Sequence, residues 1–125
     1  MIVLQLPKRA TQGRELGDIT KMAGEYKSLA RYVLVDPSAG EGKDFDVVQC
    51  SELMNGLHSA MPNTRIGIAG GFDGINVIKK VSGISEIYHD DFCIDAQAKL
   101  RTKDNKYIDV GKAGKYIKNA ARVLL

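Results

Sequence analysis

The sequence lacks the features that mark membrane-bound, secreted or multi-domain proteins. No apolar run approaches the roughly 18 residues that span a membrane, and the short apolar run at the start of the chain does not fit a signal peptide. There is no long linker, no low-complexity tract and no break in composition. We therefore expect the 125 residues to form one domain, 1–125, with a core of its own.

Cysteine and aromatic residues are also scarce. The two cysteines, Cys50 and Cys93, lie far apart in sequence, and neither spacing nor neighbours suggest metal ligation. We expect both to be reduced, buried thiols of a cytoplasmic protein. Aromatic residues make up 6% of the chain and do not alternate with basic residues, which argues against nucleic-acid binding despite a net charge of +3. We predict no metal and no cofactor.

What the sequence does contain is an alternation of two patterns. Four short apolar segments predict strands over residues 2–6, 31–35, 65–69 and 92–95. After each strand, apolar residues recur every three or four positions and predict helices over 16–30, 47–61, 77–84 and 110–124. We expect Gly83 to interrupt the third helix and Asp109 to form the N-cap of the last.

This alternation predicts an α/β fold, in which a parallel sheet is covered by helices. One βα unit takes roughly 30 residues, and four units are half of a (β/α)8 barrel, whose usual length is about 250 residues. We therefore expect a (βα)4 parallel half of a TIM barrel. A flavodoxin-like domain is a weaker alternative, because that fold usually adds a fifth strand and orders its strands differently.

Parallel α/β folds bind their ligands at the carboxyl ends of the strands, and Asp36 lies at such an end. A carboxylate there is a candidate general acid or base, although an aspartate that only braces the loop fits the same position. The loop that follows contains Gly40, Gly42 and Lys43, which suit the binding of an anion. It is not a P-loop, because proline and aspartate replace the first glycine and the final serine or threonine of that motif.

Candidate ligand-binding residues also follow the third and fourth strands. Gly70 and Gly71 have no Cβ atoms, so their N–H groups can approach a phosphate closely, next to a helix N-terminus. A tight strand-to-helix turn without a ligand is the simpler explanation of a lone glycine pair. Asp95 and Gln97 lie at the same end of the sheet if the expected strands are correct.

Three segments resemble phosphoribosylanthranilate isomerase, a (β/α)8 barrel enzyme of tryptophan biosynthesis. VLVDPSAGEGKDFD (33–46) resembles the segment of its sixth strand, and IGIAGGFDGINV (66–77) resembles the segment of its seventh. The order and separation of the two segments match, and IDVGKAGKYIKNA (108–120) is similar to the terminal helix. The resemblance covers nearly the whole chain but only the C-terminal half of that barrel.

The resemblance implies an Amadori rearrangement of a phosphosugar. Asp36 would be the general acid that opens a phosphoribosyl ring, and Gly70 and Gly71 would donate N–H groups to the phosphate. The family's general base, a cysteine at the end of the first barrel strand, has no counterpart here. The family's eighth-strand phosphate motif is replaced by IDAQAKLR, where Arg101 can supply the charge that is lost, together with Asp95 and Gln97.

Two function classes remain open: such an isomerase, incomplete in this chain alone, or a non-catalytic protein that binds a phosphorylated small molecule or serves assembly. Four strands cannot close a barrel, so strand edges and an apolar inner face are left open to association. We expect either a homodimer that completes eight strands or an N-terminal half-barrel that is missing from this chain. Neither nucleic acid nor membrane is an expected partner.

Overall fold

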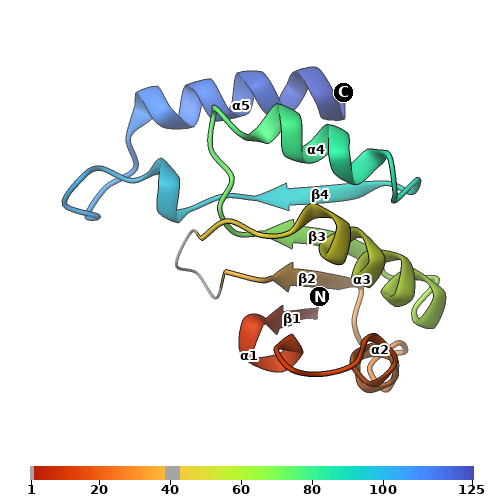
Figure 1. The fold of residues 1–125 in the computed structure, drawn as a ribbon. Helices are drawn as coiled ribbons and strands as arrows, with labels where there is room; N and C mark the ends of the chain where they lie inside the picture. The colour runs from red at the N-terminus through yellow and green to blue at the C-terminus, as the bar shows by residue number, and fades with distance from the viewer. Residues whose placement is uncertain (1, 39–42) are drawn as a thin grey trace.

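The structure is a computed structural model, and it describes residues 2–38 and 43–125. Its centre is a four-stranded, all-parallel sheet with the strand order β1-β2-β3-β4 (Figure 1). The strands are β1 (Val3–Pro7), β2 (Tyr32–Asp36), β3 (Arg65–Ala69) and β4 (Phe92–Asp95). The helices are α1 (Lys8–Thr11), α2 (Leu16–Gly24), α3 (Val47–Ala60), α4 (Val77–Ser85), the 3-10 helix η1 (Ala98–Leu100) and α5 (Val110–Leu124).

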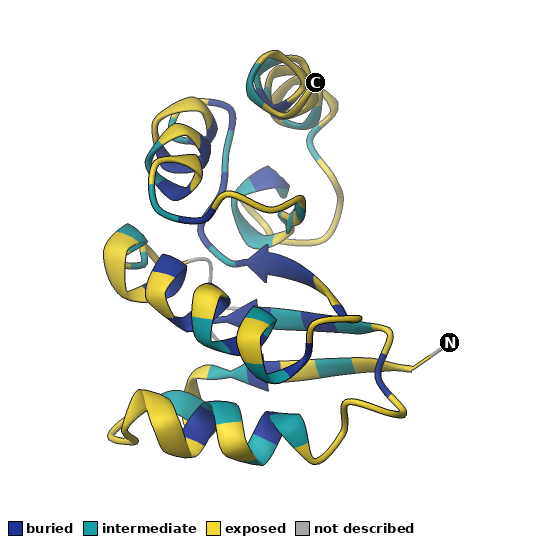
Figure 2. Ribbon diagram, turned by 90° about the vertical axis from the view of Figure 1, so that its right-hand side faces the viewer, coloured by how far each residue is buried: buried dark blue, intermediate teal, exposed yellow. Residues whose placement is uncertain are grey.

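Each strand lies beside the strand that precedes it in the chain. Right-handed crossovers that all step in one direction place their helices on the same face of a sheet. The longer helices accordingly lie along one side of the sheet (Figure 2). The strand side chains that join them in the core are Leu6, Val33, Val35, Ile66 and Ile68.

No helix of residues 2–38 and 43–125 forms a layer on the opposite face of the sheet, which is called the bare face below. Strand register places Gln5, Leu34, Gly67 and Cys93 in one row across this face. Of the four, only Gly67 is buried. A Cβ on Gly67 would lie 2.6 Å from the Cys93 sulfur, so side chains of the adjacent strands occupy the space above the glycine.

Helix α3 is central to the helix layer, and its sequence explains both its start and its packing. The Asp46 side chain accepts a hydrogen bond from the backbone N–H of Gln49 at 3.0 Å and caps the helix. Met54 and Leu57 are completely buried, and burial of each such side chain contributes about 2 kcal/mol. Asp109 caps α5 in the same way through Lys112, which confirms the predicted N-cap.

The predicted strands and three of the four predicted helices are confirmed within one or two residues. The helix predicted over 16–30 instead ends at Gly24, and of the apolar residues beyond its end Tyr26 and Leu29 are exposed. The predicted interruption at Gly83 is wrong. Helix α4 runs through this residue, where a Cβ would lie 3.1 Å from Val47, so the glycine allows close helix packing.

The prediction of two buried thiols is right for Cys50 and wrong for Cys93. Phe92 and Ile94 point to the helices, so the alternation of a strand turns Cys93 to the bare face. Burial raises the pKa of the Cys50 thiol to about 12. None of the helices in the described part of the chain is long and apolar enough to cross a membrane.

Candidate functional site

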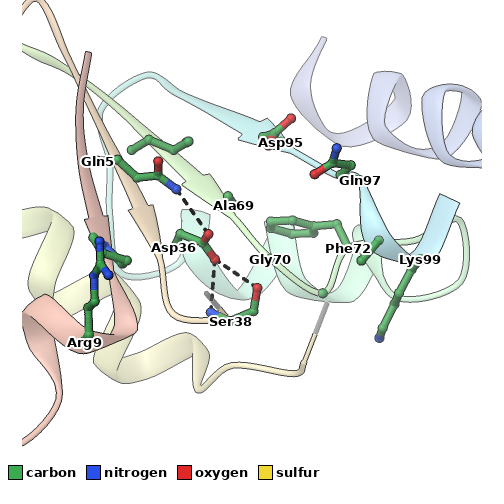
Figure 3. A pocket seen from close by; sticks show the side chains of 14 residues that line it. Gln5, Arg9, Asp36, Ser38, Ala69, Gly70, Phe72, Asp95, Gln97 and Lys99 are labelled. Carbon is green, nitrogen blue, oxygen red and sulfur yellow. Dashed lines mark hydrogen bonds between the residues drawn. The ribbon is translucent and has the colours of Figure 1, made fainter. Parts of the chain in front are cut away.

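A cavity of about 410 Å³ opens at the carboxyl ends of the strands (Figure 3). All four strands or the segments after them contribute to it, and we call it the strand-end cavity. Its polar side chains come from Gln5, Arg9, Asp36, Ser38, Asp95, Gln97 and Lys99. A second cavity of about 570 Å³ lies between the segment 8–19 and α3, and none of the predicted site residues that the structure describes lines it.

Asp36 is buried in the wall of the strand-end cavity. Its Oδ1 accepts hydrogen bonds from the backbone N–H of Ser38 at 3.2 Å and from the Ser38 hydroxyl at 2.9 Å. Its Oδ2 accepts a hydrogen bond from Nε2 of Gln5 at 3.3 Å (Figure 3). Three donors therefore hold the carboxylate in one orientation at the edge of the cavity.

Gln5 was not predicted as a site residue, although the sequence contains a signal for it. It is the one polar residue in the apolar run of β1, and strand alternation places it on the bare face beside Leu34 of β2. A polar residue that interrupts such a run indicates a side chain outside the core, and Gln5 is exposed, so its amide can reach a polar partner. Here the partner is the carboxylate at the end of the neighbouring strand.

Gly70 and Gly71 adopt positive φ angles of +96° and +69°, which favour glycine. A Cβ on Gly70 would lie 2.5 Å from the Ser38 hydroxyl oxygen and 3.2 Å from Asp36 Oδ1. A Cβ on Gly71 would overlap the backbone carbonyl of Lys43. The glycine pair thus allows the loops after β2 and β3 to interlock, which supports its interpretation as a tight turn.

The segment after the glycines is a closed turn that leads into α4. The Asp73 carboxylate accepts hydrogen bonds from the N–H groups of Ile75 and Asn76, both at 2.8 Å. The Asn76 side chain donates to the Gly71 carbonyl at 2.6 Å and accepts from the Asp73 N–H at 3.0 Å. These bonds explain the spacing of the aspartate and the asparagine in the segment FDGIN (72–76). They also hold the backbone carbonyl of Gly71 in place.

Asp95 lies on the bare face and lines the same cavity, as does Gln97. Strands β2 and β4 are separated by β3, and neighbouring strands are about 4.8 Å apart, so the backbones at Asp36 and Asp95 are about 10 Å apart. The cavity therefore has one carboxylate on each side of Ala69 (Figure 3).

Arg101 does not join the other predicted residues. Its guanidinium Nη1 donates to the backbone carbonyl of Asn105 at 3.3 Å, and its backbone pairs with Ile108 in an antiparallel bridge. Lys43 does not line the cavity, and its backbone packs on Gly71. Gly40 and Gly42 lie outside the described residues.

Positive charge in the cavity comes instead from Arg9 and Lys99, which lie on opposite sides of it (Figure 3). The ammonium group of Lys99 is also 3.7 Å from a carboxylate oxygen of Asp73. Sequence reasoning missed both residues because they belong to α1 and η1, which are too short to show a helical period. The sequence offered one signal for Arg9 and Lys99, which is that each follows soon after a strand, β1 or β4.

Lys80 holds residues 44 and 45, at the end of the loop that leads into α3, in place. It is buried, pairs with Asp44, and its ammonium nitrogen is 3.8 Å from the centre of the Phe45 ring. The hydrogen bond and charge of Lys80 lower the pKa of Asp44. Phe45 in turn packs edge-to-face on Phe72, with ring centres 5.3 Å apart. The loop end is thus attached to both α4 and the turn after β3.

Comparisons of the chain with known protein families, curated proteins and solved structures found no match. The resemblance to phosphoribosylanthranilate isomerase therefore stays a prediction. Among the described residues, no three His, Cys, Asp or Glu side chains form a group that could hold a metal ion.

Proposed function

We propose that the chain binds a small phosphorylated molecule in the strand-end cavity and that Asp36 transfers a proton to or from it, as in a phosphosugar isomerase. One observation carries this proposal. A carboxylate held by three hydrogen bonds shares a cavity with two basic side chains, Arg9 and Lys99. The cavity lies at the end of the sheet where α/β proteins bind ligands.

We also propose that the scaffold is one half of a (β/α)8 barrel. The sequential strand order and the placement of the helices on one face both fit that geometry. A doubly wound fold such as flavodoxin reverses its strand order and covers both faces of the sheet. In a half-barrel, the bare face with Gln5, Leu34 and Cys93 would belong to the barrel interior.

The chemistry follows from the positions of the charges. Arg9 and Lys99 suit the phosphate, and Asp36 suits a ring oxygen that accepts a proton as the sugar ring opens. The rearrangement then requires a base that removes the proton from the neighbouring carbon. Asp95 is the second carboxylate of the cavity and suits that step. Cys93 does not, because desolvation raises the pKa of its thiol.

A second candidate function is binding without catalysis, with Asp36 as a brace between loops. The observation that favours it is that both oxygens of Asp36 already accept hydrogen bonds from Gln5 and Ser38. The packing of Gly70 and Gly71 against these loops also needs no ligand. The two functions share the phosphate-binding cavity and differ only in what Asp36 does.

The variant Asp36→Asn separates the two functions. The asparagine oxygen can still accept both bonds from Ser38, and the amide of Gln5 can rotate to accept from the new NH₂ group, so the brace is kept. If Asp36 is the acid, isomerase turnover on a phosphoribosylamine falls by orders of magnitude while ribose 5-phosphate binds unchanged. Wild-type protein that binds ribose 5-phosphate but has no turnover identifies the binding function.

Calorimetric titration with inorganic phosphate and ribose 5-phosphate tests the cavity itself. Arg9→Ala should weaken binding about 10- to 100-fold, because hydrogen bonds to charged groups contribute about 1.5–3 kcal/mol. Arg101→Ala is the matched control, since Arg101 lies outside the cavity and bonds to Asn105. Equal losses in both variants, or no binding by the wild type, would contradict the proposal.

A further inference from the structure

Helix α5 has an apolar stripe that is exposed to solvent. Val110, Ile117 and Leu124 are 84%, 64% and 36% exposed. They are spaced by seven residues, or about two helical turns, so they lie along one side of the helix. The side of α5 that packs on the rest of the protein carries Tyr116, Ala120 and Val123 instead.

The stripe belongs to one end of the sheet. In Figure 1, α5 lies beyond β4, at the opposite end of the molecule from β1 and α2. Strand β4 pairs only with β3 among the described strands, so the backbone groups of its other edge have no strand partner. This end therefore combines an open strand edge with a helix that extends past it.

The other end of the sheet also has an open strand edge. Within the described sheet, β1 pairs only with β2, and the exposed residues Ile2 and Val3 lie at its start. The short helix α1 and helix α2 lie next to β1 at this end in Figure 1. The first long helix after it, α2, exposes the apolar residue Leu16. This end thus offers an open strand edge beside α2, where the first end offers an open strand edge beside α5.

The charges of the two ends are opposite. Helix α5 contains four basic residues and no acidic residue. Residues 15–25, which comprise α2 and its two caps, contain three acidic residues and one basic residue. The two helices lie at opposite ends of one molecule, so this complementarity can act only between molecules.

We propose that two copies of the chain associate through these two ends. Strand β4 of each copy pairs with β1 of the other, and the stripe of α5 packs over that β1 and against α2 of the other copy. Because each copy supplies both ends, the two contacts are identical and related by a two-fold axis. Eight strands then form a closed sheet with no free edge, which is the number that a side-chain-filled barrel needs.

Light scattering after size-exclusion chromatography tests the association directly. The wild type should have twice the mass of one chain at micromolar concentration. The double variant Val110→Glu with Ile117→Glu should be a folded monomer, because the dissociation constant of its dimer should be at least 100-fold higher than that of the wild type. Val48→Glu is the matched control, because Val48 is 53% exposed on α3, away from both ends. A monomeric wild type, or a species larger than two chains, overturns the proposal.

A charge exchange tests which surfaces meet. One variant carries Lys118→Glu and Arg122→Glu on α5, and the other carries Glu15→Lys and Asp18→Lys at α2. All four side chains are exposed, so both variants should fold, as circular dichroism will show. Each variant alone should be monomeric, and an equimolar mixture should regain the dimer, because both contacts then join opposite charges. A mixture that stays monomeric places the interface elsewhere and overturns the proposal.

Discussion

The two sides of the strand-end cavity are built differently. On the side of β2 and β3, Asp36 and Ser38 are buried and hydrogen-bonded, and Gly70 of the next loop packs directly on them. On the side of β4, Asp95 and Gln97 are exposed. The first side is set by the fold before any ligand arrives, whereas the second can adjust to a ligand. Substitutions on the first side should therefore change stability, and those on the second should change only binding.

The largest expected effect is that of Gly71→Ala, which tests whether the loops after β2 and β3 are interlocked. The new Cβ would overlap the backbone carbonyl of Lys43, and the φ angle of +69° is unfavourable for alanine. We expect a loss of about 3 kcal/mol in the free energy of unfolding, measured by urea denaturation.

Gly13→Ala is the control for Gly71→Ala. Gly13 has the same φ of +69°, but no atom lies within 4 Å of the position of its Cβ. It should lose only the cost of the backbone conformation, about 1 kcal/mol. If the two variants are equally destabilised, the collision with Lys43 has no energetic weight and the loops are not interlocked.

The next effect compares the two carboxylates of the cavity. Asp36→Ala leaves the buried Ser38 hydroxyl without its acceptor and should cost about 2 kcal/mol in unfolding free energy. Asp95→Ala removes an exposed side chain from an edge strand and should cost less than about 0.5 kcal/mol. Urea denaturation of both variants measures the difference. Equal losses would show that the two sides of the cavity are equally set by the fold.

This difference between the two sides also separates what could be predicted from sequence from what could not. The strands and long helices were predictable because apolar residues repeat with a clear period in each. The positions of Asp36, Gly70 and Gly71 at strand ends followed from those strands. The contact of Gln5 with Asp36 did not, because it depends on the register of β1 against β2.

Short elements limited the prediction of the cavity's charges. Arg9 and Lys99 lie on α1 and η1, each about one turn long, where no period can develop. Arg101 was predicted to supply the charge lost with the eighth-strand phosphate motif of the resembled family. Its backbone instead pairs with Ile108, and its guanidinium donates to the Asn105 carbonyl outside the cavity. Nothing in the sequence distinguishes Lys80 from its neighbour Lys79, and only the fold reveals its pairing with Asp44 and its contact with the Phe45 ring.

A smaller effect tests how the loop between β2 and α3 is held. Lys80→Met removes the pairing with Asp44 and the contact of the ammonium group with the Phe45 ring, and should cost about 1 kcal/mol. Lys79→Met on the exposed side of the same helix is the control and should cost less than about 0.5 kcal/mol. Thermal denaturation at neutral pH compares the two variants.

The same pair has a signature at acidic pH. Lys80 holds the pKa of Asp44 below its ordinary value of 3.8, so the pairing stabilises the wild type above that pH. This stabilisation is lost as the pH falls below 3.8 through the lower, folded-state pKa of Asp44. Lys80→Met should flatten the stability curve in that window. An unchanged curve would mean that the pair does not hold the loop.

The last effect arises only at alkaline pH and concerns Tyr116 of α5, a partly buried side chain that packs against the core. Burial, with the charge of nearby Asp95, raises the pKa of Tyr116 from 10.0 to about 12. The neutral phenol is favoured in the folded state, so its contribution to stability is complete below pH 10 and is lost as the pH rises to about 12. Tyr116→Phe keeps the ring and removes the ionisable hydroxyl group. The free energy of unfolding of this variant should therefore fall less between pH 10 and about 12 than that of the wild type. If the two proteins lose stability equally in alkaline urea denaturation, Tyr116 is ionised as easily as in the unfolded chain, and α5 does not shield it at the β4 end of the sheet.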